Sequence, residues 1–599
     1  MMLTQFDVQV LEQSYALLER GDVAAAQARL GALPDAKLQH PDVVHLLALI
    51  MIRLGETGEA RDFLEYATRT APKSYGIWAS YANLLGDLGE IDAAKSATQK
   101  AAALDPKAAD PWLNFGISAM DAGQFDEAGV ALERASGIAP AMTAVWTARG
   151  LLEQRRGAPD AAVGHYQQAL AHDPRDARSR HNLGVSLRAI DQREAALEQI
   201  ELAIALGSMV PESFTMRAHL LADLGRFDDA VGQYREIVKA VPEHLDAHET
   251  LALLLPQVGA HTAALDSYRA ALDDVRASPE LWRSALGAAK AVGDYDQLLA
   301  WAVEAETTLG ADPGFVLARA TGLMHSGNPL AALTALEQLV NQLPDDPAAH
   351  SHLAYVLLML GDPAKAEAHA VRATQLAPLD QSGWAYLTVI WRLLNDPREA
   401  WLADYDRLVM PIDIVSADEA MALATIVDTL HLTAEHPAEQ SLRGGTQTRG
   451  NIFDRRNPDM RGFAAHVRGA VEGWLAQLPR DDSHPFLARN SGVISFAGSW
   501  SVRLRSAGYH TNHIHQEGWL SSAFYVSLPS EVGASEAGAL TFGAPDAALG
   551  VDLAPRRIAV PRAGRLVLFP SYFWHGTLPF ESAQPRTTMA FDAVPVFTA

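Results

Sequence analysis

GEIDAAKSATQKAAALDP, residues 89–106, is the stretch that decides the fold of most of this chain. It opens on Gly89, has an alanine five residues later at Ala94, and closes on Pro106. Glycine permits the turn between two helices, and the small alanine side chain lets their backbones approach closely. Proline cannot continue the preceding helix because it lacks an N–H. The stretch is therefore typical of the second helix of an antiparallel pair.

The same pattern recurs with a period of 34 residues. The glycines in phase with Gly89 are Gly21, Gly55, Gly123, Gly157, Gly225, Gly259, Gly293, Gly327 and Gly361. Asp191 and Asn395 occupy the two remaining turn positions, and both residue types tolerate turn conformations. Alanine follows five residues later in every unit except one, which has Leu298. Twelve units in one phase resemble the tetratricopeptide repeat.

The repeats predict an all-α superhelix over residues 5–409, which we call the repeat arm. Each unit buries its apolar face only against its neighbours, so the arm should be extended and should carry a concave groove. Such grooves usually hold extended peptides or partner helices, and we expect a protein or peptide partner. A spacer or an oligomerisation scaffold is the alternative, and the oligomeric state stays open.

Charge and composition exclude several functions. Of the net charge of −24, only −3 lies on residues 411–599, which hold 15 Arg, no Lys and 18 Asp or Glu, so −21 lies on residues 1–410. This acidity argues against nucleic acid as a partner and permits a basic protein. The absence of cysteine excludes disulfides, thiolate metal sites and cysteine nucleophiles.

No segment of the sequence indicates a membrane protein. The longest apolar run, within residues 43–52, is far too short to cross a bilayer. The first residues lack the basic flank and the small-residue cleavage site of a signal peptide. We therefore expect a cytoplasmic protein without membrane association.

The residue pattern of the sequence changes near residue 410, after the 34-residue repeats have ended. Helices are expected over residues 417–431 and 460–478, and a polar, glycine-bearing stretch lies at 441–450. The segments with strand character are 492–497, 500–505, 520–528, 539–542, 557–560, 565–569 and 587–594. Short strands separated by Gly and Pro turns predict a β-sandwich or barrel over residues 410–599.

The residues that suggest chemistry lie on these expected strands. His513 and His515 would share one face of an extended chain, because side chains alternate there with a period of two. His575 follows an expected strand and turn, and Arg586 and Thr588 share a face further on. Nitrogen or oxygen ligands with open positions suit a non-haem Fe(II) oxygenase. An arginine suits a carboxylate co-substrate through a bidentate pair.

The order of the motifs in residues 441–594 resembles the Fe(II)/2-oxoglutarate-dependent dioxygenases, in the bacterial subgroup that follows tetratricopeptide repeats. The matching motifs are GTQT at 445–448, HIH at 513–515, SAFYV at 522–526, GALTF at 538–542, GRLVLFPS at 564–571, His575 and Arg586. Each motif is weak alone, but their order and spacing together are fairly specific.

This resemblance implies a double-stranded β-helix, or jelly roll, after the repeat arm. It implies that His513 and His575 are iron ligands, that Arg586 binds 2-oxoglutarate, and that Thr588 and Tyr525 assist it. Fe(II), 2-oxoglutarate and O₂ would be the cofactor and co-substrates, and no catalytic residue is expected apart from the metal site. The implied reaction oxidises an unactivated C–H bond and releases CO₂ and succinate, with the protein supplying ligands and orientation.

One position departs from the usual family pattern. The common ligand pair is His-x-Asp or His-x-Glu, whereas this chain has His515 in the third position. Three neutral imidazoles would leave Fe(II) with one more positive charge than a set with a carboxylate, which would change affinity and redox tuning. We expect His515 to be the third ligand. Glu517, which shares its face if the strand continues, is the alternative.

The sequence thus supports one leading function and three alternatives. The leading one is an oxygenase that hydroxylates a protein or peptide side chain delivered by the repeat arm. The same chemistry on a small molecule, with the arm as a docking module, is the second. A non-catalytic protein-interaction scaffold is the third. A cupin-like lyase or isomerase with three histidines is the fourth, and it would leave Arg586 without a role.

Overall fold

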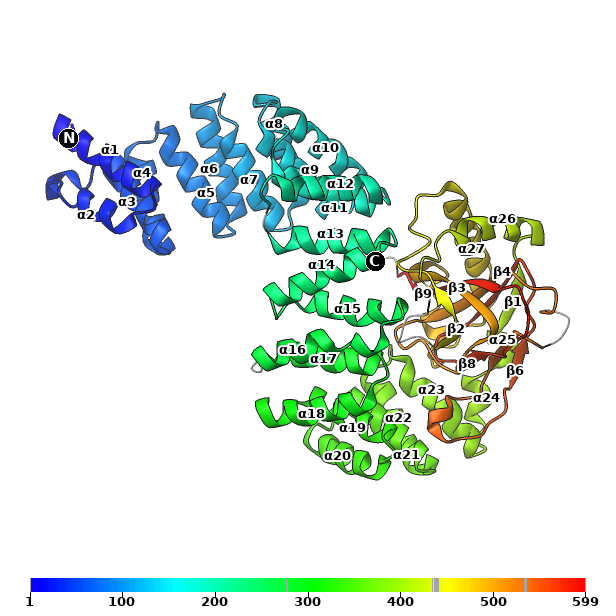
Figure 1. Cartoon of the computed structure of the whole chain (residues 1–599). Helices are drawn as coiled ribbons and strands as arrows, with labels where there is room; N and C mark the ends of the chain where they lie inside the picture. The colour runs from blue at the N-terminus through cyan, green and yellow to red at the C-terminus, as the bar shows by residue number, and fades with distance from the viewer. Residues whose placement is uncertain are drawn as a thin grey trace. The chain divides into compact units, whose positions relative to one another are not determined.

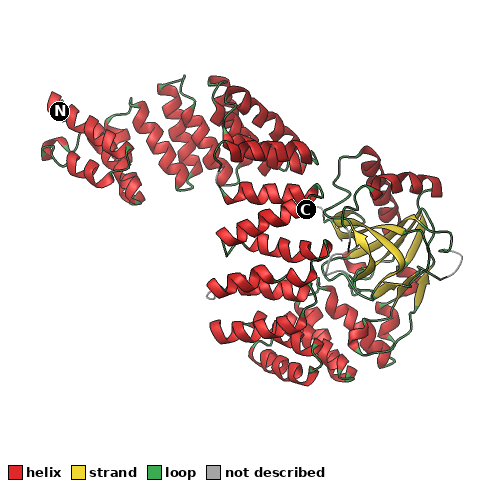
Figure 2. Cartoon of the chain, viewed as in Figure 1, coloured by secondary structure: helices red, strands yellow, loops and turns green. Residues whose placement is uncertain are grey.

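The computed structural model of the chain describes residues 2–208, 210–275, 278–433, 435, 441–532 and 536–597 (Figure 1). Its contacts divide it into two compact units, Met1–Met216 and Arg217–Ala599. The described part of the first unit is helical, whereas the second contains both helices and strands (Figure 2). Within the described residues, no helix combines the length and the apolar character needed to cross a membrane.

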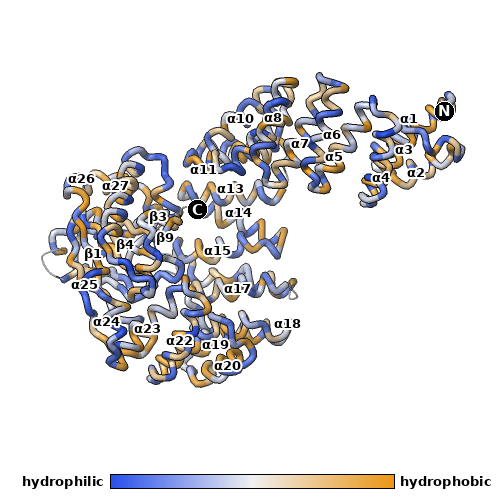
Figure 3. Tube along the Cα trace, turned by 180° about the vertical axis from the view of Figure 1, so that it is seen from behind, coloured by the Kyte–Doolittle hydropathy of each residue, from blue (hydrophilic) through white to orange (hydrophobic). Residues whose placement is uncertain are grey.

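Helices of similar length follow one another through the first unit, and consecutive helices pack together. They are α1 (Gln5–Glu19), α2 (Val23–Leu30), α3 (Pro41–Leu54), α4 (Thr57–Thr70), α5 (Tyr75–Asp87), α6 (Ile91–Leu104), α7 (Asp110–Asp121), α8 (Phe125–Ile138), α9 (Thr143–Arg155), α10 (Pro159–His172), α11 (Ala177–Ala189) and α12 (Arg193–Ala205). Apolar and polar residues mix along each helix, as expected where one face packs on a neighbour (Figure 3).

The division between the units falls within α13 (Pro211–Asp223), and the same helical pattern continues beyond it. The later helices are α14 (Phe227–Ala240), α15 (Leu245–Gln257), α16 (Asp266–Asp274), α17 (Pro279–Ala291), α18 (Tyr295–Leu309), α19 (Pro313–His325), α20 (Pro329–Gln342), α21 (Pro347–Met359), α22 (Pro363–Leu376), α23 (Gln381–Leu393), α24 (Arg398–Leu402) and α25 (Tyr405–Leu408). These helices confirm the predicted tetratricopeptide superhelix.

The turn and alanine positions behave as the repeat pattern predicts. The ten turn glycines have φ between 72° and 83°, and Asp191 and Asn395 adopt the same left-handed region at 61° and 53°. The phased alanines from Ala26 to Ala366 are buried, as is Leu298. Only the last, Ala400, is exposed, because its helix α24 is cut to five residues and has no following repeat to pack on.

Beyond the helices, two antiparallel sheets form a jelly roll, as predicted. The larger sheet has the order β1 (Met410–Asp413), β7 (Arg565–Pro570), β4 (Leu520–Ser527), β9 (Arg586–Pro595), β3 (Ile494–His510) and β2 (Leu442–Gln447). The smaller has the order β6 (Arg557–Ala559), β5 (Leu540–Phe542) and β8 (His575–Thr577). Their inner faces meet where the Phe542 and Phe569 rings lie 5.0 Å apart.

The strands differ in detail from those expected from sequence. The two segments predicted at 492–497 and 500–505 are one strand, β3, with a register shift between Phe496 and Gly498. The polar stretch 441–450 contains β2, in which Gly444 has φ of 70° and the register shifts beside it. Gly444 therefore forms a bulge within a strand. The expected helices are present as α26 (Ala417–Asp428) and α27 (Pro458–Leu475).

The last repeats and the jelly roll share one apolar core within the second unit. The Trp574 indole N–H donates to the Ala385 carbonyl oxygen of α23 over 3.0 Å, and the Tyr572 hydroxyl donates to the Leu402 carbonyl oxygen over 2.8 Å. The Arg392 guanidinium also donates to two carbonyl oxygens of the jelly roll. The predicted domain limits, 5–409 and 410–599, stay a prediction, since this core crosses them without interruption.

Candidate functional site

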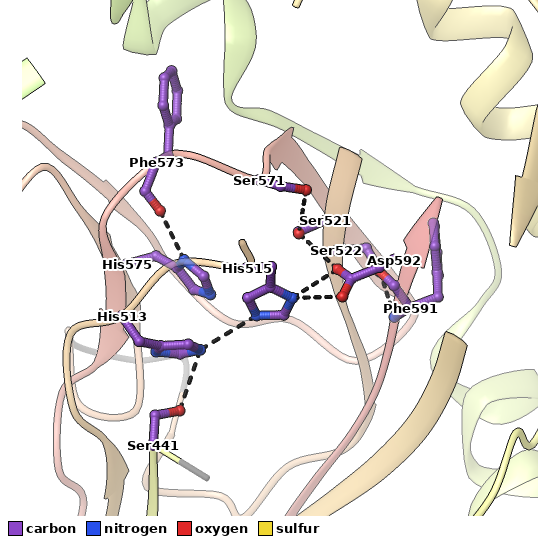
Figure 4. A network of polar contacts seen from close by, with 10 residues as sticks. All are labelled: Ser441, His513, His515, Ser521, Ser522, Ser571, Phe573, His575, Phe591 and Asp592. Carbon is purple, nitrogen blue, oxygen red and sulfur yellow. Dashed lines mark hydrogen bonds and ion pairs between the residues drawn. The ribbon is translucent and has the colours of Figure 1, made fainter. Parts of the chain in front are cut away.

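Three histidine side chains meet in a cavity of about 530 Å³ inside the jelly roll. The candidate ligand atoms of His513, His515 and His575 all lie within 4.8 Å of one another. His575 opens β8 and forms an isolated β-bridge with His513 through two main-chain hydrogen bonds of 2.9 and 3.0 Å. The main-chain N–H of His515 donates to the Ser571 carbonyl oxygen. Figure 4 shows the three rings converging.

His513 and His515 both line the cavity, as a shared face predicts. The segment that carries them lies outside a regular strand, since β3 ends at His510. Both residues are placed by their main-chain bonds to the segment 571–575. Glu517 lines the cavity mouth, but it is exposed and is not one of the three converging residues.

Each of the three imidazoles donates its Nδ1–H away from the point of convergence. His513 and His575 donate to the carbonyl oxygens two residues before them, over 2.8 and 2.9 Å. His515 donates to the Asp592 carboxylate, both of whose oxygens lie 2.7 Å from Nδ1. Because carbonyl and carboxylate oxygens only accept, all three rings carry hydrogen on Nδ1 and keep Nε2 as the atom that faces the others.

This arrangement fits a metal ion. The Nε2 atoms of His513 and His515 lie 3.3 Å apart. Two lone pairs at that distance repel unless a proton or a metal ion lies between them. Nitrogens bound to one metal ion at about 2.1 Å and at about a right angle would lie about 3 Å apart. Imidazole ligands suit iron, zinc, copper and nickel.

The pKa values of two of the three rings also suit metal binding. Burial, with a smaller contribution from His515, lowers the pKa of His513 to about 3. Burial and the two neighbouring histidines lower the pKa of His575 well below its usual value. Burial alone would lower the pKa of His515, but the charge and hydrogen bond of Asp592 raise this pKa above its usual value. His513 and His575 are therefore neutral at physiological pH, as metal ligands must be.

Two of the predicted co-substrate residues line the same cavity. Arg586 and Thr588 are both buried and project into it from β9. Tyr525 of β4 pairs in register with Thr588 but is not among the residues that line the cavity. Its ring lies beneath Arg586 instead, with the guanidinium carbon 5.0 Å from the ring centroid.

Arg586 is a buried cation that needs an anion. Its side chain is 2% exposed, and within the described residues no carboxylate forms an ion pair with it. Its Nε atom and the Tyr525 hydroxyl oxygen are buried without a hydrogen-bond partner in the part of the chain that the structure describes. An uncompensated buried charge is costly. A carboxylate ligand in the cavity would provide the missing partner.

Several further cavity residues had no place in the prediction. Asp592 lies on β9 at the same alternation as Arg586 and Thr588, and this spacing could have identified it. The Ser441 hydroxyl lies 3.2 Å from His513 Nε2 and 2.9 Å from His510 Nδ1. His510 also lines the cavity.

Family models match residues in both the helical part and the jelly roll. A model described as "Putative 2OG-Fe(II) oxygenase" matches residues 498–592. Two tetratricopeptide repeat models match the helical part, one at residues 11–75, 82–142, 147–208 and 215–280 and the other at 323–388. No protein with a curated description matches the sequence significantly.

Several solved structures are similar to part of the chain. One is pilF of Pseudomonas aeruginosa, with 20% identity over 36% of this chain and 98% of that chain and a TM-score of 0.32. A tetratricopeptide repeat protein from Parabacteroides merdae has 17% identity over 41% and 96% and a TM-score of 0.33. YrrB, described as a TPR protein with an unusual peptide-binding site, has 20% identity over 31% and 95% and a TM-score of 0.27. These scores are too low to support an argument.

Proposed function

Because this chain joins tetratricopeptide repeats to a 2OG-Fe(II) oxygenase domain, we propose that it hydroxylates a protein or peptide side chain bound by the repeat arm. The observation that carries the proposal is one cavity with two features. Three imidazole Nε2 atoms converge in it, and Arg586 presents an unpaired buried charge to it. The first feature suits a metal ion and the second suits a carboxylate co-substrate.

His513, His515 and His575 would hold the iron through Nε2, and their Nδ1–H donors would keep each ring in place. Bound Fe(II) and 2-oxoglutarate would supply oxidising power from O₂, so that substrate C–H, O₂ and 2-oxoglutarate give C–OH, succinate and CO₂. This chain's residues would orient the co-substrate and exclude water. Three histidine ligands leave positions free for small molecules on the metal.

Arg586 would bind the carboxylate of 2-oxoglutarate that lies far from the metal. Its planar guanidinium can make two parallel hydrogen bonds to a carboxylate. Burial strengthens such a pair because little water competes. The Tyr525 hydroxyl and the Thr588 side chain lie beside it and would help to fix the carboxylate.

The protein substrate is supported by the repeat arm and by its charge. Stacked repeats form extended surfaces that suit peptides and partner helices. Residues 1–410 carry −21 of the net charge, which favours a basic partner. A cytoplasmic location would agree with the absence of cysteine.

An anaerobic titration tests the proposal. Fe(II) and 2-oxoglutarate added to the purified protein should produce a visible charge-transfer absorption band, because the co-substrate would bind the iron directly. The band should disappear in His575→Ala. In Arg586→Gln, the 2-oxoglutarate concentration needed for half of the band should rise by about 100-fold, since a buried charge-assisted pair is lost.

Matched controls come from the same domain. His466→Ala removes an exposed histidine, and Arg562→Gln removes an arginine that pairs with Asp413 on the surface. Both should retain the band and its concentration dependence. If folded wild-type protein gives no band and binds no iron, the oxygenase proposal is refuted and the scaffold alternative is favoured.

A further inference from the structure

We propose that Asp592 is a positioning residue of the metal site. Through His515, it would supply the carboxylate charge that a His-x-Asp or His-x-Glu ligand pair would supply directly. The inference rests on the proposed function and extends it, because it explains how a site with three neutral ligands is balanced.

The contact between Asp592 and His515 differs from those of the other two ligands. Both carboxylate oxygens lie 2.7 Å from His515 Nδ1, whereas His513 and His575 donate to neutral carbonyl oxygens. The His515 and Asp592 side chains are only 16% and 19% exposed, so water screens the pair weakly. A charge-assisted hydrogen bond of this kind is about twice as strong as a neutral one.

Asp592 is itself fixed by its neighbours. The Ser521 hydroxyl donates to Asp592 Oδ1 over 2.7 Å, and Ser521 and Ser571 share a hydrogen bond of 2.8 Å. Gly518 makes room for this group, since a Cβ there would collide with the Ser571 hydroxyl. The carboxylate therefore cannot turn freely, and it orients the His515 ring.

The direction of this contact places Asp592 behind its histidine. Nδ1 and Nε2 lie at separate positions of the ring, and Nε2 is the atom that faces His513. Figure 4 shows Asp592 on the side of His515 away from His513 and His575. Asp592 thus acts on the metal through the imidazole and not as a ligand.

Asp592 would also change the net charge of the proposed metal site. A divalent metal ion with two neutral histidines and one carboxylate has a net charge of +1, whereas three neutral histidines leave +2. Asp592 restores +1 when it is counted with the site. Hydrogen bonding to a carboxylate also makes an imidazole a better electron donor to its metal. As a neutral ligand, His515 would keep this contact as a hydrogen bond from Nδ1–H to the Asp592 carboxylate.

Metal affinity tests the inference without an activity assay. The dissociation constant for Mn(II), a stable substitute for Fe(II), is measured by equilibrium dialysis on the full-length protein. Asp592→Asn keeps the size and an acceptor oxygen but removes the charge, and it should weaken Mn(II) binding by about 10- to 100-fold. Ser521→Ala keeps the charge and should weaken it by no more than about threefold. Asp552→Asn, which removes an exposed carboxylate of the same domain, should have no effect.

Each outcome decides between the possible roles. Asp592→Asn binding within threefold of wild type overturns the inference while leaving the proposed function intact. A loss as complete as that in His575→Ala also overturns it, because Asp592 would then be a ligand. Failure of wild type to bind any metal removes the proposed function as well. Should Asp592→Asn not fold, a crystal structure of the Mn(II)-loaded wild type decides, since an Asp592–metal bond would refute the inference.

Discussion

His431 is held without charge between two hydroxyl groups beside the cavity. The Ser501 hydroxyl donates to the Thr588 carbonyl oxygen over 2.8 Å, so it accepts from His431 Nε2–H over 3.0 Å. His431 Nδ1 then accepts from the Thr446 hydroxyl over 2.8 Å. Burial, with a smaller contribution from Arg503, lowers the pKa of His431 to about 3. This chain of hydrogen bonds connects β2, β3 and β9 only while the ring is neutral.

The neutral His431 makes stability depend on pH. Its pKa is lower in the folded protein than the value of about 6.5 in the unfolded chain, so the unfolded chain binds more protons between about pH 3 and 6.5. The stability is complete above that window and falls as the pH is lowered through it. By pH 5 the loss should be on the order of 1–2 kcal/mol. His431→Gln should reduce the difference between urea midpoints at pH 7.5 and pH 5.

Other histidines titrate as well, so the informative quantity is the difference between wild type and His431→Gln. Replacement of the exposed His466 provides the control for the loss of a histidine elsewhere in the same domain. An identical pH dependence in wild type and His431→Gln would contradict the neutral assignment.

At the scale of the elements, the final repeat packs against the segment that carries one of the three histidines. The segment 571–575, which carries His575, lies against α23 and the short helices α24 and α25. The Phe573 ring packs 4.7 Å from the Tyr405 ring, and Trp574 and Tyr572 donate to carbonyl oxygens of this repeat. The repeat therefore supports one wall of the histidine cavity.

We expect a fragment of residues 410–599 to aggregate, because it exposes Tyr572, Phe573 and Trp574 and leaves two buried donors without partners. A fragment of residues 211–599 keeps α13 whole together with the second unit. It should unfold cooperatively and bind Mn(II) within about threefold of the full chain. Expression yield, thermal unfolding and dialysis distinguish the two fragments.

The contribution of one of these hydrogen bonds to stability can be measured on the full chain. Tyr572→Phe removes a single hydrogen bond to the Leu402 carbonyl oxygen and should cost only about 1 kcal/mol. A stable, metal-binding 410–599 fragment would show that the final repeat is not needed by the site.

At the scale of the whole molecule, the repeat arm would bind the partner and the jelly roll would carry out the oxidation. The charge is concentrated on residues 1–410, whereas the histidine cavity lies wholly within the jelly roll. Binding of a basic partner to an acidic surface should weaken as salt rises, since exposed charges are screened over about 8 Å at physiological ionic strength. Chemistry inside the cavity should depend on salt much less.

Removal of residues 1–210 should therefore separate recruitment from chemistry. Turnover of 2-oxoglutarate to succinate without a protein substrate should stay within about twofold of the full chain. Oxidation of a protein partner, measured as an oxygen-atom mass increase, should fall by at least about tenfold, equivalent to about 1.4 kcal/mol of lost binding. Equal loss of both activities would show that the removed repeats support the fold of the site.

Features set by residues close together in the sequence could be predicted, whereas contacts between distant residues could not. The repeats could be predicted because turn, alanine and proline recur within 34 residues, and even Asp191 and Asn395 adopt the expected turn. The sheets were predicted in type, but β1, β2 and β8 were missed because they contain proline or glycine or are very short. The contact of Asp592 with His515 could not be predicted, because the two lie 77 residues apart and only the folded sheets bring them together.

The core shared by the final repeat and the jelly roll has a consequence for how chains of this kind can change through inheritance. Each 34-residue unit contacts chiefly its neighbours, so duplication or loss of units near the N-terminus would alter the reach of the arm and leave the surroundings of His575 untouched. Duplication within α23 or α24 would instead displace the Ala385 and Leu402 carbonyl oxygens from Trp574 and Tyr572. Insertions should therefore be tolerated in the N-terminal repeats, whereas insertions in the final repeat should disturb the histidine cavity.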